Sequence, residues 1–316
     1  MSKKILGLSF GRKMGNCEVM VKQALMTCKE AGHEIRFIRV NDLDIKDCTG
    51  CIGCVVGMIS GRSGKCHLKD DCHILDDAIM ECDGLIVGCP TFEIGPTGTF
   101  RTVCDRFGPS HDISFRKVAI EEGLAAGKDP ATLPDQRCLK KRVAAIFSVG
   151  GAMTRNWITF TLPTMYAFPM TMGIDVVDTY EYWGAMAFNN VVGNEPVMER
   201  MTAMGKHVAE AVVCDDDDPE RTRFRGDREG ACPVCHCDLL TLSDDKKSIE
   251  CPVCGIYGSF TVEDGKLIPH FSAAEQARSR LFYAGKLEHS TEIKTCAAPP
   301  GQIPDLKERL ALYRWE

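Results

Sequence analysis

Ten of the 18 cysteines in this 316-residue chain stand in two compact groups, one over residues 48–72 and the other over residues 232–254. Thiolates are the ligands that zinc, iron and iron–sulfur clusters use. We see no apolar leader at the N-terminus, and grouped cysteines in such a long chain are more typical of metal sites than of a disulfide framework. The first chemistry to consider is therefore metal binding.

The second group has the spacing of a closed four-thiolate site. Cys232 and Cys235 form one Cys-x2-Cys pair, and Cys251 and Cys254 form another after fifteen intervening residues. Two such pairs place four sulfurs around one ion. The residues between them predict a hairpin whose small core takes its folding energy from the metal. We favour a zinc ribbon, while a rubredoxin-like iron centre has the same ligands and stays open.

The first group has the spacing of an iron–sulfur site. Cys48, Cys51 and Cys54 follow one another at two-residue gaps, and Cys66 and Cys72 come later. Three such thiolates and a fourth cysteine make the ligand set of a [4Fe–4S] cluster, which is the interpretation we favour. We predict Cys66 as the fourth ligand and keep Cys72 in reserve. Redox-active thiols without metal, or a zinc site, are the alternatives.

A third candidate site lies between an apolar run and a helical pattern near the N-terminus. Residues 9–18 read Ser-Phe-Gly-Arg-Lys-Met-Gly-Asn-Cys-Glu. Backbone N–H groups at a helix start bind phosphate, and Ser9, Arg12 and Asn16 add side-chain donors. The segment matches neither the Gly-x-Gly-x-x-Gly nor the Gly-Lys-Ser/Thr motif, which weakens dinucleotide and P-loop hypotheses. A plain strand-to-helix turn is the structural alternative.

The order Ser-x-x-Arg-x-x-Gly-Asn resembles the phosphate loop of the NADPH-dependent FMN reductase family, which has the flavodoxin-like fold. Residues 88–95, followed by Asp105-Arg106, are similar to the family's Pro-x-Tyr loop and Asp-Arg pair, and residues 148–153 stand where its third flavin loop lies. The resemblance covers roughly residues 3–213. It implies FMN as the cofactor, held by Ser9, Arg12, Gly15, Asn16, Cys17, Pro90, Thr91, Phe92, Glu93, Ile94, Ser148, Gly150 and Gly151.

Two positions depart from the family pattern. Cys17 stands where relatives carry Thr or Ser, and Phe92 stands in place of the Tyr, so two hydroxyl groups are missing. The first cysteine group also resembles the iron–sulfur flavoprotein branch of the same family, although the gap before Cys66 is longer here. A loop after the second strand would reach the carboxyl edge of the sheet, beside the flavin.

The hydrophobic pattern predicts the scaffold that positions these loops. Strands are expected at residues 4–9, 34–40, 84–88, 142–149 and 175–182, and helices at residues 18–31, 74–81, 99–107 and 196–213. Strands alternating with helices predict a doubly wound α/β domain with a five-stranded parallel sheet, in the flavodoxin-like order 2-1-3-4-5. Residues 109–137 have weak periodicity, and we interpret them as an insertion.

We expect four segments along the chain. Residues 1–213 form the FMN-binding domain, with the cysteine loop at residues 47–72, and residues 214–230 form an acidic, charged linker that opens with four aspartates. Residues 231–271 form the four-cysteine metal ribbon, and residues 272–316 form a partly helical tail.

Composition narrows the class of protein. The net charge of -6 and the scattered basic residues argue against a nucleic-acid or membrane-surface partner. An apolar content of 44% fits an ordinary globular core. No apolar run reaches the length of a membrane helix, and no signal peptide is recognised, so we expect a cytoplasmic protein.

Together these features predict an FMN-dependent oxidoreductase with an adjacent iron–sulfur cluster. It would move electrons between NAD(P)H, or a ferredoxin-like protein donor, and a small organic acceptor. The alternative is an electron-transfer flavoprotein whose protein partner docks on the metal ribbon. The resemblance also implies a homo-oligomer. No motif identifies the substrate, and none distinguishes NADH, NADPH and a ferredoxin-like protein as the electron donor.

Overall fold

A five-stranded parallel sheet forms the centre of the protein in the computed structural model, which describes residues 2–188, 190–228, 230–296 and 303–314. The strand order is β2-β1-β3-β5-β6. This is the predicted 2-1-3-4-5 order, so the flavodoxin-like fold is confirmed. The strands are β1 (Lys4–Ser9), β2 (Glu34–Arg39), β3 (Gly84–Phe92), β5 (Val143–Val149) and β6 (Asp175–Tyr182), and the two-residue β4 (Gly95–Pro96) pairs with β3 alone.

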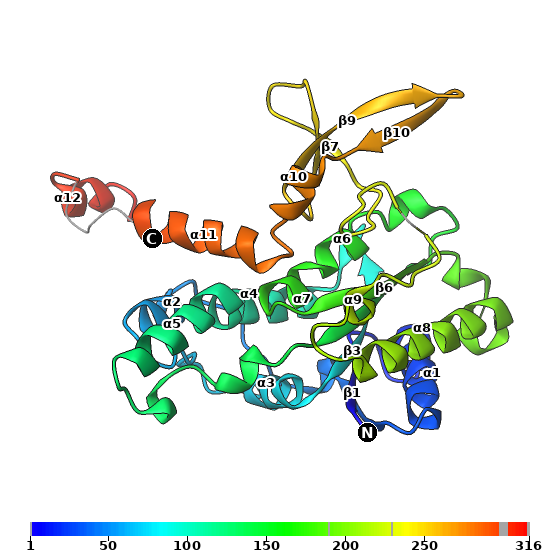
Figure 1. The fold of residues 1–316 in the computed structure, drawn as a ribbon, viewed down its shortest axis with the longest axis horizontal. Coiled ribbons are helices and arrows are strands. Elements are labelled where there is room, and N and C mark those ends of the chain that lie inside the picture. The colour runs from blue at the N-terminus through cyan, green and yellow to red at the C-terminus, as the bar shows by residue number, and fades with distance from the viewer. Residues whose placement is uncertain (1, 189, 229, 297–302, 315–316) are drawn as a thin grey trace.

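Helices cover both faces of the sheet (Figure 1). The alternation of β1 explains why, because Ile5 joins one buried cluster while Leu6 and Leu8 join the other. One face carries α1 (Asn16–Glu30) and α8 (Glu195–Val213). The other face carries α3 (Cys72–Glu81), α4 (Gly98–His111), α6 (Thr161–Met165) and α7 (Ala167–Thr171).

The segment expected to be an insertion is largely helical. α4 continues through Pro109, and α5 (Ile113–Ala125) follows it after the single residue Asp112, whose carboxylate accepts the N–H groups that open α5. α5 buries Phe115 and Ile120, so packing sustains a helix whose sequence is only weakly periodic. Short 3-10 helices lie at Val40–Asp42, Pro130–Thr132, Gln136–Leu139, Arg155–Trp157, Ala185–Ala187 and Val191–Gly193.

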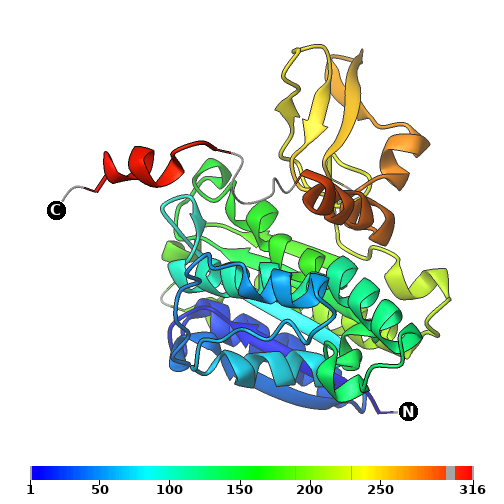
Figure 2. The same ribbon diagram turned by 90° about the vertical axis from the view of Figure 1, so that its left-hand side faces the viewer.

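A second, antiparallel sheet forms the ribbon, which stands above one end of the domain (Figures 1 and 2). Its order is β10-β9-β8-β7. The strands are β7 (Thr241–Leu242), β8 (Ile249–Cys251), β9 (Ile256–Glu263) and β10 (Lys266–His270). The tail contains α10 (Ala273–Ala277), α11 (Tyr283–Cys296) and α12 (Leu306–Ala311), and α12 stands apart from the domain in both views.

The segment between domain and ribbon is partly anchored. The aspartates at its start are exposed, as expected, but α9 (Pro219–Thr222) folds back onto the domain. The Arg221 guanidinium is buried and donates to the carbonyls of Val212, Cys214 and Lys141. The ribbon cysteines belong to the same buried cluster as the domain core, so ribbon and domain share one interior.

Candidate functional site

The loop from β1 to α1 has the form of an anion site. α1 begins at Asn16 with Gly15 as its N-cap, and no side chain caps its first turn, which leaves those N–H groups for a ligand. A Cβ on Gly11 would lie 2.8 Å from the Cβ of Cys17, so the backbone is packed as closely as it can be. Asn16 fastens the loop to a distant segment, because its Oδ1 accepts the Val191 N–H at 2.9 Å.

The side chains of Ser9 and Cys17 bond to each other within this loop. The Ser9 hydroxyl accepts the Gly11 N–H at 3.2 Å and donates to the Cys17 sulfur at 3.5 Å, so it shapes the loop from within. Burial raises the pKa of Cys17 to about 12, which keeps it a neutral thiol. Arg12 is exposed at the rim, where its charge is free to meet a phosphate.

The second predicted flavin loop is a strained hairpin. β3 runs on past Gly88 to Phe92 and turns back into β4 through Glu93 and Ile94, whose φ values are 47° and 64°. Positive φ at both turn residues is the type I′ geometry, and it is costly for a β-branched side chain such as Ile94. Strain of this kind is common at ligand-binding loops.

The second loop is held in place by a side chain that the sequence gave no reason to single out. The hydroxyls of Thr91 and Thr161 lie 2.7 Å apart, and the Thr161 hydroxyl also reaches the Ile94 carbonyl at 3.5 Å. Thr161 opens α6, 70 residues further along the chain. α6 is therefore the element that supports the flavin loop from behind.

The third loop follows β5 at the middle of the same sheet edge. Ser148 pairs in register with Cys89 on one side and Glu181 on the other. Its Oγ is fully buried and has no hydrogen-bond partner among the described residues. Gly150 next to it is fixed by a bond from its N–H to the Tyr182 carbonyl at 2.7 Å.

These three loops fit FMN on structural grounds. They present an uncapped helix start, glycine positions without room for a side chain, and an unsatisfied buried hydroxyl at one edge of the sheet. Large apolar side chains are exposed around them, namely Phe92, Met153, Trp157 and Met186. An apolar rim around a polar anion loop suits a cofactor with a phosphate tail and a flat ring.

The four cysteines predicted to hold the iron–sulfur cluster line one pocket of about 190 Å³. Cys48, Cys51, Cys54 and Cys66 surround it, whereas Cys72 lies outside it at the start of α3. α2 (Gly53–Ile59) contains Cys54, inside the segment expected to be a loop. The residues thus fit a cluster of several atoms, and Cys66 is better placed than Cys72.

The lining of the cysteine pocket includes none of the residues predicted to hold FMN, all of which the structure describes. Its wall includes Arg106, Pro109 and Ser110 from the second half of α4, and α2 packs against α4 and α5, as Figure 1 shows. At 1.5 Å per residue, Arg106 lies about 12 Å along the helix from Gly98. The loop that carries the cysteines is bonded to α4 at two places, by Asp47 on Thr102 and by Asp70 on buried Arg106.

The four ribbon cysteines are all buried and form a compact site. The sulfurs of Cys232 and Cys254 are 3.7 Å apart, and those of Cys235 and Cys251 are 3.5 Å apart. Among the described residues this is the one group of three or more Cys, His, Asp or Glu whose ligand atoms all lie within 4.8 Å of one another. A tetrahedral ion with Zn–S bonds of about 2.3 Å spaces its sulfurs about 3.8 Å apart, so the site fits a mononuclear metal.

Comparison with known proteins agrees with this geometry. Residues 4–174 match the model of the NADPH-dependent FMN reductase family. The chain belongs to that family. It is an FMN-dependent oxidoreductase with the flavodoxin-like fold. None of the helices that the structure describes is long and apolar enough to cross a membrane.

Two similar proteins match along almost the whole chain. A flavone synthase of Aspergillus candidus is 27% identical over 319 residues, covering 97% of this chain and 94% of that protein. A solved structure of a flavone reductase is 30% identical with a TM-score of 0.81, covering 98% of this chain and 96% of that one. An iron–sulfur flavoprotein of Methanocaldococcus jannaschii is 32% identical over 107 residues, 34% of this chain and 52% of that protein.

Proposed function

We propose that this oxidoreductase carries a hydride from NAD(P)H, by way of FMN, to a planar conjugated organic molecule of the flavone type. The observation that carries the proposal is the end-to-end similarity to two proteins named for flavone chemistry, which includes the ribbon and most of the tail. The exposed apolar side chains around the flavin loops support it, because a flat, weakly polar substrate gains most from such surroundings.

In this proposal the residues of the chain bind the cofactor and orient the substrate. The N–H groups at the start of α1 and the exposed Arg12 hold the phosphate, and the buried Ser148 hydroxyl is left to bond the cofactor. FMN, when bound, supplies the hydride chemistry. Phe92 and Met153, at the rim, give an apolar surface that excludes water from a substrate lying over the site.

Anaerobic turnover tests this function. The FMN-loaded protein is mixed with NADH or NADPH and flavone, and the products are analysed by mass spectrometry. We expect oxidation of the nicotinamide to match formation of a product two hydrogens heavier than flavone. Flavin that NAD(P)H reduces but that flavone never reoxidises would exclude this substrate class.

We further propose that the cysteine pocket holds an iron–sulfur cluster bound by Cys48, Cys51, Cys54 and Cys66. The convergence of these four residues on one pocket supports it, as does the partial similarity to the iron–sulfur flavoproteins. Such a cluster would supply single-electron exchange. Because the pocket lies along α4, the opposing flavin site of a second copy in a homo-oligomer is a candidate for that exchange. Iron and sulfide analysis of anaerobically purified protein, together with its molar mass in solution, tests both points.

The second candidate is an electron-transfer flavoprotein that serves a protein partner. The exposed apolar side chains of the β9–β10 hairpin, Phe260, Val262 and Leu267, favour it, because they form a strip that a partner could cover. Flavin bleaching by a reduced ferredoxin but not by NADH or NADPH would support this function over the first. Replacing Val262 and Leu267 with Ser should then slow that bleaching.

A further inference from the structure

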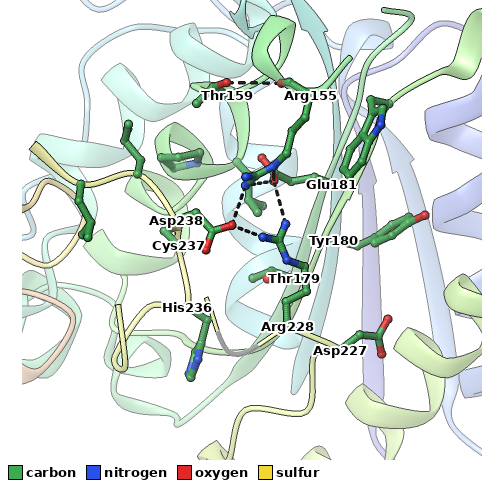
Figure 3. A pocket seen from close by; sticks show the side chains of 15 residues that line it. Arg155, Thr159, Thr179, Tyr180, Glu181, Asp227, Arg228, His236, Cys237 and Asp238 are labelled. Atoms are coloured by element: carbon green, nitrogen blue, oxygen red, sulfur yellow. Dashed lines mark hydrogen bonds and ion pairs between the residues drawn. The ribbon is translucent and has the colours of Figure 1, made fainter. Parts of the chain in front are cut away.

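A pocket of about 320 Å³ lies where the edge strand β6, the segment around α6 and the start of the ribbon meet (Figure 3). This volume is at the small end of the range for ligand sites. Its lining includes none of the residues predicted to hold FMN, all of which the structure describes. The pocket is therefore a separate feature from the flavin loops.

Four charged side chains from three distant segments meet at the centre of this pocket, as Figure 3 shows. Arg155 donates to Glu181 at 2.7 Å and lies 3.0 Å from Asp238. Arg228 pairs with the same Asp238 oxygen and lies 4.0 Å from the Glu181 carboxylate. Two guanidinium groups thus alternate with two carboxylates, and the cluster has no net charge.

One buried oxygen of this cluster has no hydrogen-bond partner among the residues that the structure describes. Glu181 is 9% exposed, and both arginines approach its Oε2, while no described residue bonds its Oε1. An unpaired carboxylate oxygen in a buried place carries a desolvation cost that a hydrogen-bond donor would remove. A ligand at this point should therefore bring a hydroxyl or a similar donor.

The remainder of the pocket is apolar. Leu162 and Pro163 come from α6, Leu239 and Leu240 come from the ribbon, and Trp183 follows β6. A flat hydrocarbon body would pack against these side chains. A carboxylate ligand is disfavoured, because Glu181 and Asp238 already occupy both guanidinium groups.

We propose that the pocket between domain and ribbon binds a small hydroxylated aromatic molecule, with its hydroxyl on Glu181 Oε1 and its ring between the ribbon leucines and α6. The site is independent of the flavin face. The pocket and the second flavin loop both contact α6, since Leu162 lines the pocket and its neighbour Thr161 bonds the flavin loop.

Calorimetric titration of the FMN- and metal-loaded protein with three matched naphthalenes tests the ligand class. The probes are 2-naphthol, its methyl ether and 2-naphthoate, which share a ring and differ in the polar group. We expect 2-naphthol to bind about tenfold or more tightly than the other two, the difference expected for a hydrogen bond to a charged acceptor. Absence of naphthol binding, or equal binding of the ether or the naphthoate, would overturn the proposal.

Two variants test the location. Glu181→Gln removes the charged acceptor, and Leu240→Trp puts a larger side chain into the pocket while all four charged residues are kept. Their matched controls are Glu199→Gln on the exposed side of α8 and Leu242→Trp on the exposed side of β7. We expect naphthol affinity to fall about tenfold or more in the first pair and to stay unchanged in the controls. Wild-type affinity in Leu240→Trp contradicts the assignment even if Glu181→Gln fails to fold.

Discussion

Gly11 shows at the scale of one residue how tightly the phosphate loop is built. In a Gly11→Ala variant the new Cβ would lie 2.8 Å from the Cβ of Cys17, and helix α1 cannot retreat because it is packed against α8. Overpacking of this kind costs about 1–3 kcal/mol. The loop must move away from the shape that binds the phosphate, so we expect the dissociation constant for FMN to rise roughly tenfold. Quenching of FMN fluorescence measures it. Gly108→Ala, where no described side chain or other segment lies within 4 Å of the new Cβ, is the control and should bind FMN normally.

The fourth ligand of the proposed cluster is a choice between two single residues. Cys66 lines the pocket with the other three cysteines, and Cys72 does not. We expect Cys66→Ser to lose the broad visible absorbance and most of the bound iron, while Cys72→Ser keeps both. Iron analysis of anaerobically purified variants decides it. Loss of iron in Cys72→Ser alone would reverse the assignment.

How far single residues can be predicted depends on how far apart in the chain their partners lie. The phosphate loop is readable because its donors and glycines follow one another within a few positions. The sequence does not reveal the unpaired Ser148 hydroxyl or the bond from Thr161 to the flavin loop. Each depends on contacts between strands or helices that are remote in sequence. The charged cluster around Glu181 is missed for the same reason.

At the scale of elements, Asp83 fastens the ends of neighbouring strands. Its carboxylate accepts the Lys4 N–H at 2.8 Å and pairs with Lys140 at 2.8 Å, so it joins β1, β3 and the approach to β5. Burial works to raise the pKa of Asp83, but Lys140 and the Lys4 N–H outweigh it and hold the pKa below 3.8. A depressed pKa stabilises the fold above the unfolded value and loses that contribution as pH falls through the folded value.

Asp83→Asn should therefore cost about 1–3 kcal/mol of unfolding free energy near neutral pH, the value of hydrogen bonds to a charged group. The difference from wild type should shrink as the pH falls below the ordinary pKa of an aspartate and through the lowered pKa of folded Asp83. Denaturant unfolding followed at several pH values measures both effects. Asp217→Asn, at a carboxylate that is 99% exposed, is the control, and an equal loss there would refute the interpretation.

The elements were predicted best where the hydrophobic pattern and the local breakers agree. β6 has the expected bounds, and α1 and α8 differ by only a residue or two at their ends. α4 runs past its expected end at residue 107 and through Pro109, because the packing of Phe107 on Phe168 and the bond between His111 and Asp76 outweigh the loss of one N–H bond. The β9–β10 hairpin was not predicted, although apolar Phe260 and Val262 alternate with polar Thr261 and Glu263 along β9.

At the scale of the whole molecule, the ribbon packs against the domain in addition to having its own four-cysteine site. Tyr166, fully buried at the end of α6, donates its hydroxyl to the Cys235 carbonyl, and the ribbon cysteines join the domain's buried cluster. The ribbon therefore helps to shape the pocket beside α6. Its own interior is made mostly of the four cysteines of the compact site and a few apolar neighbours such as Ile249 and Ile256.

Removing the ribbon metal should unfold the ribbon and leave the FMN-binding domain folded. Without the ion the four sulfurs would lose the bonds that hold both knuckles, and so small a core cannot fold alone. The parallel sheet keeps the whole cluster beneath α1 and α8, and it keeps the domain residues of the cluster on its other face. We expect chelation or Cys232→Ser to release one metal ion and to raise hydrogen exchange over residues 232–270, with FMN still bound. Cys237→Ser is the matched control, because that buried thiol is outside the four-sulfur group and should keep the metal. Simultaneous loss of FMN and metal would show instead that domain and ribbon fold as one unit, with α6 carrying the dependence from Cys235 to the flavin loop.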